Sequence, residues 1–195
     1  MTTIFLGMGL LLLTLAGFSL FSMKAPKGSA AMSGLANAAV ATFLVEAVHR
    51  YISGDLLGSA FLGEVGSVSG SLGGVASAIL IPISMGANPL FAVVAGVAVG
   101  GYSILPGFVV GYLIGFIAPA GLDTILGALL LAPIARGIAF LTDPVVNAAM
   151  GYIGNTITAA TDQSPVLMGF LLGGIIKMIC TSPLSSMALT AMLGL

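Results

Sequence analysis

The feature that most constrains this chain is its scarcity of charged residues. Lys, Arg, Asp and Glu make up 6% of the 195 residues, whereas 58% are hydrophobic and the mean hydropathy is +1.21. Soluble domains carry about a quarter of their residues as these four types. Apolar runs such as 3–22 approach the roughly 20 residues that a helix needs to cross a bilayer. The composition therefore predicts an integral membrane protein.

The apolar runs predict helices and not barrel strands. Stretches such as 10–13 and 79–83 are continuously apolar, whereas strands of a barrel alternate apolar and polar residues. Proline and glycine divide the chain into the expected spans 3–22, 30–48, 67–85, 89–105, 107–120, 124–141, 145–160 and 166–180. The prediction is an all-α polytopic transmembrane bundle of about 6 to 8 segments, forming a single integral membrane domain over 1–195.

Several of these segments are short and are bounded by proline. Breaks are expected at Pro106, at Asp143-Pro144 and at Pro183. Short, proline-interrupted apolar segments are typical of re-entrant hairpins and broken transporter helices, although proline-kinked helices have the same signature. We expect at least one re-entrant element. Asp123 and Asp143 precede expected helices, so both are predicted to be N-caps and not proton carriers.

The 28 glycines alternate with serine and alanine, most densely over 54–74. Small residues allow membrane helices to approach closely, so helix packing explains them within one chain or between chains. The alternative is that 67–74 is a non-helical stretch that lines a cavity. The small-residue faces at 70–74 and 96–100 can pack helices within or between chains, and a chain this short has little surface to enclose a cavity alone, so we predict a homodimer or larger oligomer.

The second expected span ends in a polar group. Glu46 and Arg50 are four residues apart, which suits an ion pair on one helix. Either this is a pair at the membrane interface, or Glu46 or His49 faces a central cavity and binds substrate hydroxyls. The single histidine cannot form a metal site alone, and no His, Cys and acidic residues have metal-ligand spacing. No metal or cofactor is therefore expected.

A polar stripe follows one face of the expected helix 145–160 and the residues after it. Its members recur every three or four positions: Asn147, Gly151, Asn155, Thr158 and Asp162. On an apolar helix such a stripe faces a partner helix, a watery cavity or the membrane surface. The sequence leaves cavity lining and helix–helix contact equally open.

Two basic residues fall within apolar segments. Lys177 lies deep in the last expected span, and Arg136 follows Pro133. A charge at such depth is costly, so it faces the bundle interior or extends to the headgroups. Both interpretations remain open for each residue.

No catalytic constellation is evident. Ser182, Ser185 and Ser186 have no partner histidine except the distant His49. The net charge of −1 and the lack of a basic cluster give no electrostatic support for nucleic-acid binding. The expected partner is the lipid bilayer.

One C-terminal run resembles a known family. It consists of LMG at 167–169, TSPLSSMA at 181–188 and MLGL at 192–195, after a helix rich in Asn, Thr and Ala. The run resembles the second EIIC family of the phosphoenolpyruvate-dependent sugar phosphotransferase system, which includes a proposed regulator of perfringolysin production. The resemblance covers about the last 50 residues and is compositional before them. Family members continue beyond this motif, so we expect a truncated or half-length form or a fragment.

The resemblance implies a membrane transport subunit, an EIIC-like permease that crosses the bacterial inner membrane several times. Its cargo would be a small polar solute, with a sugar expected, and its partners the phosphocarrier proteins EIIB and EIIA. It would have no catalytic chemistry of its own. The alternative is a membrane-embedded regulatory or scaffolding protein without transport.

The predicted binding site is the helix break at 181–186, facing Asn147 and Asn155. Pro183 lacks an N–H and disfavours helix at Ser182, so nearby backbone groups are free to bind a solute. The competing interpretation is a kinked helix whose serines bond to their own backbone. The full set of predicted solute-binding residues is Glu46, His49, Asn147, Asn155, Lys177, Ser182, Ser185 and Ser186.

Overall fold

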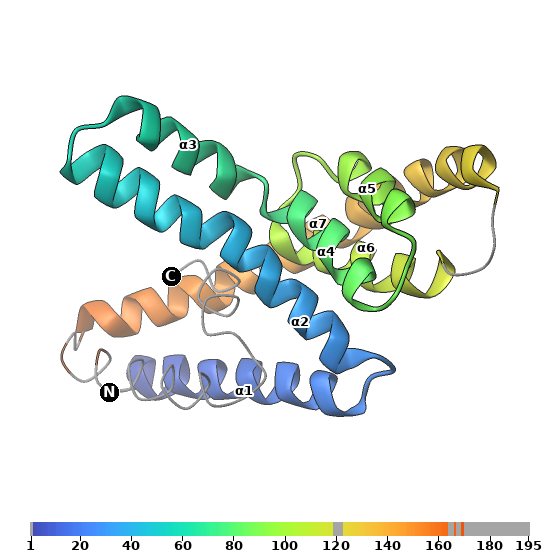
Figure 1. Ribbon diagram of the computed structural model, residues 1–195. Coiled ribbons are helices and arrows are strands. Elements are labelled where there is room, and N and C mark those ends of the chain that lie inside the picture. Colours follow the sequence, from blue (N-terminus) through green and yellow to red (C-terminus); the bar gives the residue numbers. More distant parts are fainter. Residues whose placement is uncertain (1, 119–122, 164–165, 167–168, 170–195) are drawn as a thin grey trace.

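The computed structural model describes residues 2–118, 123–163, 166 and 169, and these form helices without any strand (Figure 1). The all-α fold predicted from the sequence is therefore confirmed. In chain order the helices are α1 (Thr2–Lys24), α2 (Gly28–Ala39), the π-helical segments η1 (Val40–Leu44) and η2 (Ala47–Leu56), α3 (Ala60–Ser71), α4 (Gly73–Ser84), α5 (Pro89–Ala98), α6 (Ile104–Ile117) and α7 (Thr124–Gln163).

Among the residues that the structure describes, two continuous helices are long and apolar enough to cross a bilayer. They are Gly28–Leu56, which joins α2 to η1 and η2 over 29 residues, and Thr124–Thr156 within α7, with 33 residues. The pair α3 and α4 passes the same test together but is bent by 58° at its junction, as in a broken span or a re-entrant loop. The apolar helices α5 and α6 are shorter. How many segments cross the membrane stays a prediction.

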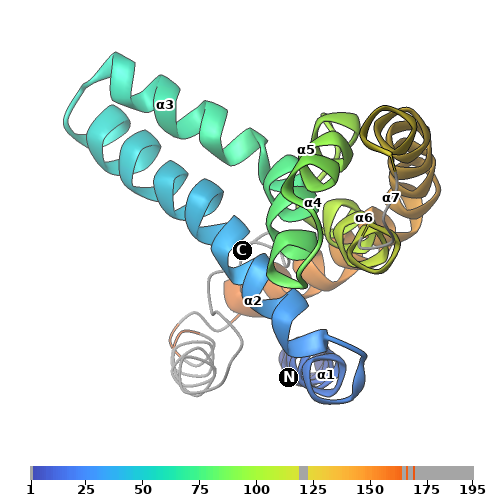
Figure 2. The ribbon, with the colours of Figure 1, turned by 45° about the vertical axis from the view of Figure 1, so that its right-hand side comes forward.

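The helices form a cluster with a projecting hairpin. Figures 1 and 2 show α4, α5, α6 and the first part of α7 gathered on one side, while α3 and the end of the Gly28–Leu56 helix project together on the other. Buried apolar residues join α4 to α7 in one core: Ala78, Ala87, Phe91, Ala95, Val99, Val110, Ile114, Ala118, Leu131, Ala135 and Ala139. The helix α1 packs against α2 and α7.

Glycines bring α6 into backbone contact with α4. Gly107, Gly111 and Gly115 recur every four residues, and a Cβ on Gly111 would lie 2.9 Å from the Ser77 carbonyl oxygen. The buried Ser77 hydroxyl donates to the Ile104 carbonyl at 3.0 Å, which links the two helices. This is the close small-residue packing that membrane helices use in place of a hydrophobic driving force.

The expected break at Pro106 is wrong. Pro106 lies in the first turn of α6, where backbone N–H groups have no intrahelical partner, so a missing N–H costs nothing there. The break lies earlier, in the loop 99–103 between α5 and α6. Gly101 in this loop has φ +89°, a backbone conformation that favours glycine.

The expected boundary at Asp143-Pro144 is also wrong, because α7 continues through Pro133 and Pro144. The Thr142 hydroxyl donates to the carbonyl of Ile138 at 2.8 Å, just before the proline. Proline is tolerated inside membrane helices because neighbouring groups can satisfy the backbone that it leaves unpaired. The separate spans 124–141 and 145–160 are thus one helix.

The expected span 67–85 is divided differently. The helix α3 begins at Ala60, and Leu72 separates it from α4. The alternative of a non-helical 67–74 is wrong as well, because all of these residues except Leu72 are helical. The two helices change direction where three glycines, Gly70, Gly73 and Gly74, permit close approach of other chain segments.

Glycines also close the hairpin between η2 and α3. A Cβ on Gly66 would lie 2.9 Å from the Arg50 Cα, and one on Gly54 would lie 2.7 Å from the Gly63 Cα. A Cβ on Gly96 would meet Ile79 of α4. The small-residue faces at 70–74 and 96–100 are therefore used inside the chain, while the homodimer remains a prediction.

Candidate functional site

A pocket of about 410 Å³ opens where α3 meets α4. We call it the junction pocket, and its lining residues are Phe43, Gly70, Ser71, Gly73, Gly101, Tyr102, Ser103 and Ile104. They come from η1, from both sides of the α3–α4 bend, and from the loop 99–103 with the start of α6. The lining combines two aromatic rings with two hydroxyl side chains and glycine backbone, a mixture suited to a small amphipathic molecule.

Glu46 lies beside this pocket. Its carboxylate occupies the space in which Gly70 would carry a side chain, so the acid sits directly on the pocket-lining backbone of α3. Arg50 donates to Glu46 Oε1 at 2.8 Å, which confirms the predicted pair. The Glu46 side chain is 17% exposed and that of Arg50 46%, so the acid is the better shielded partner.

Asn147 on α7 contacts the pocket lining without being part of it. The Ser103 hydroxyl donates to Asn147 Oδ1 at 3.1 Å. Asn147 Nδ2 in turn donates to Asp143 Oδ1 at 2.7 Å, one turn earlier on the same helix. Asp143 is therefore not an N-cap: its carboxylate orients the Asn147 amide. Asp123 is an N-cap as predicted, since it accepts from the backbone N–H of Ile125 at 3.0 Å.

His49 is half-buried, and its Nδ1 is buried and makes no hydrogen bond to any described residue. It is three residues from Glu46 on the same continuous helix but is not among the pocket-lining residues. Asn155 lies two turns beyond Asn147 on α7 and is exposed. Glu46 and Asn147 are not lining residues either, but each contacts one, namely Gly70 and Ser103.

The other predicted binding residues lie outside the described part of the chain. These are Lys177, Ser182, Ser185 and Ser186, together with the break at 181–186. Within the residues that are described, no three His, Cys, Asp or Glu side chains gather as metal ligands.

Most residues that line the junction pocket were not predicted from the sequence. Phe43 and Ser71 belong to no recognisable motif. Tyr102 and Ser103 follow a Gly-Gly pair that does not match a phosphate loop. One signal was available: Gly100, Gly101, Tyr102 and Ser103 form a polar, flexible interruption between two apolar runs. The idea that 67–74 lines a cavity was correct in part, because Gly70, Ser71 and Gly73 do so from helical ends.

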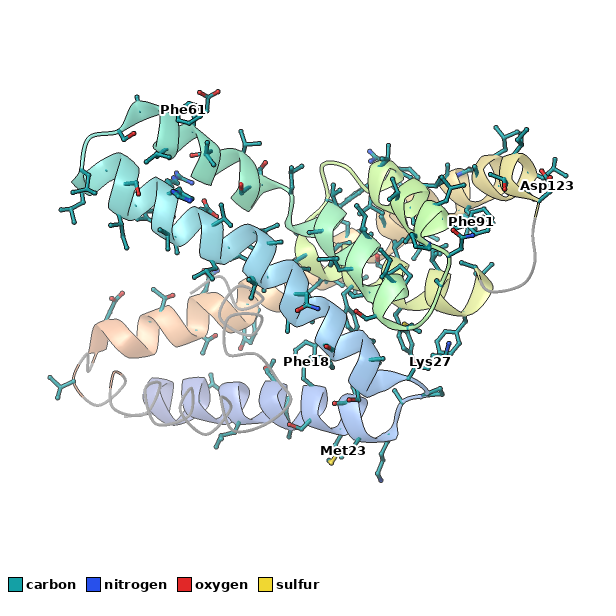
Figure 3. The ribbon with its side chains drawn as sticks, in the orientation of Figure 1. Phe18, Met23, Lys27, Phe61, Phe91 and Asp123 are labelled. Atoms are coloured by element: carbon teal, nitrogen blue, oxygen red, sulfur yellow. The ribbon has the colours of Figure 1, made fainter. Side chains whose placement is uncertain are left out.

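A second, shallower pocket of about 350 Å³ lies on the outer side of α3, lined by Phe61, Glu64, Val65, Val68 and Ser69. Figure 3 shows Phe61 on the outside of the projecting hairpin. Phe61 is 73% exposed. The lining of this pocket is mainly apolar and comes from a single helix, so it lacks the converging polar groups of the junction pocket.

The chain was compared with known proteins. Residues 29–195 match the family model described as "Phosphotransferase system, EIIC". No curated protein and no solved structure matches. The match extends well beyond the C-terminal run that carried the resemblance, and whether the likeness peaks in that run stays a prediction. Because the match covers most of the sequence, the chain belongs to the EIIC family and is a membrane component of the phosphotransferase system that works with EIIB and EIIA.

Proposed function

We propose that this protein carries a sugar or a similar polyhydroxylated solute across the bacterial inner membrane, which it crosses several times. The solute would bind in the junction pocket. The observation that best supports this is that Glu46 and Asn147, from separate helices, each contact a residue that lines this one pocket. A volume of about 410 Å³ lies within the usual range for small-molecule sites.

The chemistry of the pocket suits a sugar. The Glu46 carboxylate accepts hydrogen bonds only, so it pairs with solute hydroxyls. The Ser71 and Ser103 hydroxyls both donate and accept. Phe43 and Tyr102 offer ring faces to the apolar C–H surface of a sugar ring. A pocket of this kind holds a neutral polyol by several directed bonds and two apolar contacts.

The chain would need no catalytic group of its own. In this system a phosphorylated EIIB supplies the phosphoryl group, while the EIIC component binds the sugar and presents one hydroxyl. The bend between α3 and α4 places the pocket at a helix junction, the kind of broken element at which transporters bind their substrates. Ser182, Ser185, Ser186 and Lys177 remain proposed contributors from outside the described residues.

The test is solute binding and uptake. Purified protein, reconstituted in liposomes with its EIIB, would be offered a panel of labelled hexoses, pentoses, disaccharides and polyols. Glu46→Gln should weaken binding of the preferred solute by about tenfold, since a hydrogen bond to a charged group contributes about 1.5–3 kcal/mol. The matched control is Glu64→Gln, which alters a carboxylate on the outer pocket of α3 and should leave binding unchanged.

Equal losses in both variants would refute the assignment to the junction pocket. Binding of no solute in the panel by folded wild-type protein would refute the transport proposal. That result would favour a regulatory or scaffolding role in the membrane.

A further inference from the structure

Arg136 is a charged residue that the proposed function leaves unexplained. It lies within the membrane-length part of α7 and makes no ion pair within the part of the chain that the structure describes. A charge in such a segment is rare and needs a specific partner. The structure gives Arg136 partners at the end of α5 and on the loop that follows it.

That loop is 99–103, between α5 and α6. Arg136 Nη1 donates to the carbonyl of Gly100 at 2.7 Å and to the carbonyl of Ala98 at 3.1 Å. These carbonyls lie at the end of α5, where backbone acceptors lack intrahelical partners and favour a cation. The guanidinium also lies over the Tyr102 ring, 4.5 Å from its centroid, in a cation–π contact.

The same loop forms one wall of the junction pocket through Gly101, Tyr102 and Ser103. On its far side Ser103 bonds to Asn147, eleven residues after Arg136 on α7. Two residues of α7 therefore bond to this loop, Arg136 and Asn147, and they lie about 16 Å apart along the helix axis. The loop contains three successive turn residues, with φ +89° at Gly101, and has little regular structure of its own.

We propose that Arg136 is a positioning residue for the solute pocket. It does not line the pocket; it holds the carbonyls of the loop and the Tyr102 ring so that Tyr102 and Ser103 keep their places in the pocket wall. This inference rests on the proposed function, in that the molecule whose affinity it sets is the solute of the junction pocket.

Lysine is a poor substitute in this position. An ammonium could donate to both carbonyls, as the single nitrogen Nη1 does, but it lacks the planar group that lies over the Tyr102 ring at the same time. Arg136→Lys should retain the charge but loosen the loop. Arg136→Ala should remove the hydrogen bonds to both carbonyls and the contact with the Tyr102 ring.

The first measurement needs no solute. In a Cys180→Ala background, Ser71→Cys places a lone thiol on the pocket wall opposite the loop. A bulky maleimide should label this thiol slowly when Arg136 is present. The labelling rate should be higher in Arg136→Lys and highest in Arg136→Ala. The matched control is Thr142→Val, because the Thr142 hydroxyl bonds only to carbonyls of its own helix.

The second measurement is solute affinity. Arg136→Ala should weaken binding of the preferred sugar by about tenfold, the effect of losing one or two charge-assisted bonds. In a double-mutant cycle with Tyr102→Leu, the losses of binding free energy should be less than additive, since both residues act through one loop. In a cycle with Glu46→Gln, which alters the contact with Gly70, the two losses should add. If Arg136→Ala does not fold, Arg136→Lys and Tyr102→Leu make the same comparison.

The two measurements separate this inference from the proposed function. Faster labelling in the Arg136 variants without binding of any sugar would support the anchoring of the loop and refute the solute assignment. Unchanged labelling would overturn the inference. Equal losses of affinity in Arg136→Lys and Thr142→Val would also overturn it, because they would indicate general destabilisation of α7.

Discussion

Alanine at Gly34 tests the close packing of α2 on α4. A Cβ built on Gly34 would lie 2.6 Å from the Ile81 Cα, 2.7 Å from the Leu80 carbonyl oxygen and 3.0 Å from the Ile81 nitrogen. All three are backbone atoms, which cannot rotate away as a flexible side chain would. Since ordinary contact begins at 3.4 Å, the two helices must separate locally by about 0.8 Å.

The magnitude follows from a matched substitution in an open place. Gly137 lies inside α7, and a Cβ added to it would have nothing within 4 Å. Both changes gain the same helix preference of alanine over glycine, about 0.5–1 kcal/mol. That gain cancels in the difference between Gly34→Ala and Gly137→Ala. What remains is the cost of overpacking, about 1–3 kcal/mol.

The assay is unfolding in dodecyl maltoside micelles by added SDS, followed by the loss of helical circular dichroism. Gly34→Ala should lower the free energy of unfolding by about 1–3 kcal/mol relative to Gly137→Ala. If the two variants unfold at the same SDS fraction, the backbone contact between α2 and α4 is not as close as described, and the reasoning fails.

Three further changes can be followed by the same unfolding assay. Ser77→Ala removes the hydroxyl that bonds to the Ile104 carbonyl across α4 and α6 and should cost about 1 kcal/mol; an unchanged midpoint would contradict this link. Asp123→Ala should cost about 1 kcal/mol as a lost N-cap, whereas Asp123→Asn should retain most of the stability, and equal losses would argue against capping. Tyr112→Phe should cost about 0.5–1.5 kcal/mol, because its hydroxyl donates to the Pro26 carbonyl at 2.9 Å while the ring contacts are kept; wild-type stability would show that this bond contributes nothing.

Local spacing predicted the features that depend on one turn of helix. Glu46 and Arg50 were expected to pair because residues four apart lie on one face of a helix, and they do. Asp123 was expected to cap the helix that follows, and it does. Such features need no knowledge of the remainder of the fold.

The prolines did not predict the helix boundaries correctly, because the effect of a proline on a helix depends on its surroundings. Pro106 fits the first turn of α6, and Pro144 is accommodated inside α7. Two real interruptions fall at Leu72, where Gly74 lies against the Tyr102 carbonyl, and at 99–103, where Gly101 has φ +89°. A kink signal in the sequence gives no information on whether a neighbour will compensate for the lost bond.

The sequence alone determined that this is an all-α membrane protein and that Glu46 and Asn147 were candidates for binding, since composition and helical period depend only on residue order. Only the tertiary structure decided that those two residues flank one pocket, and that Tyr102 and Ser103 line it. Their positions are separated by about 40 to 100 residues of chain. Contacts at such separation are set by how the glycine faces bring α4 against α6 and α3 against η2, and no local pattern encodes that geometry.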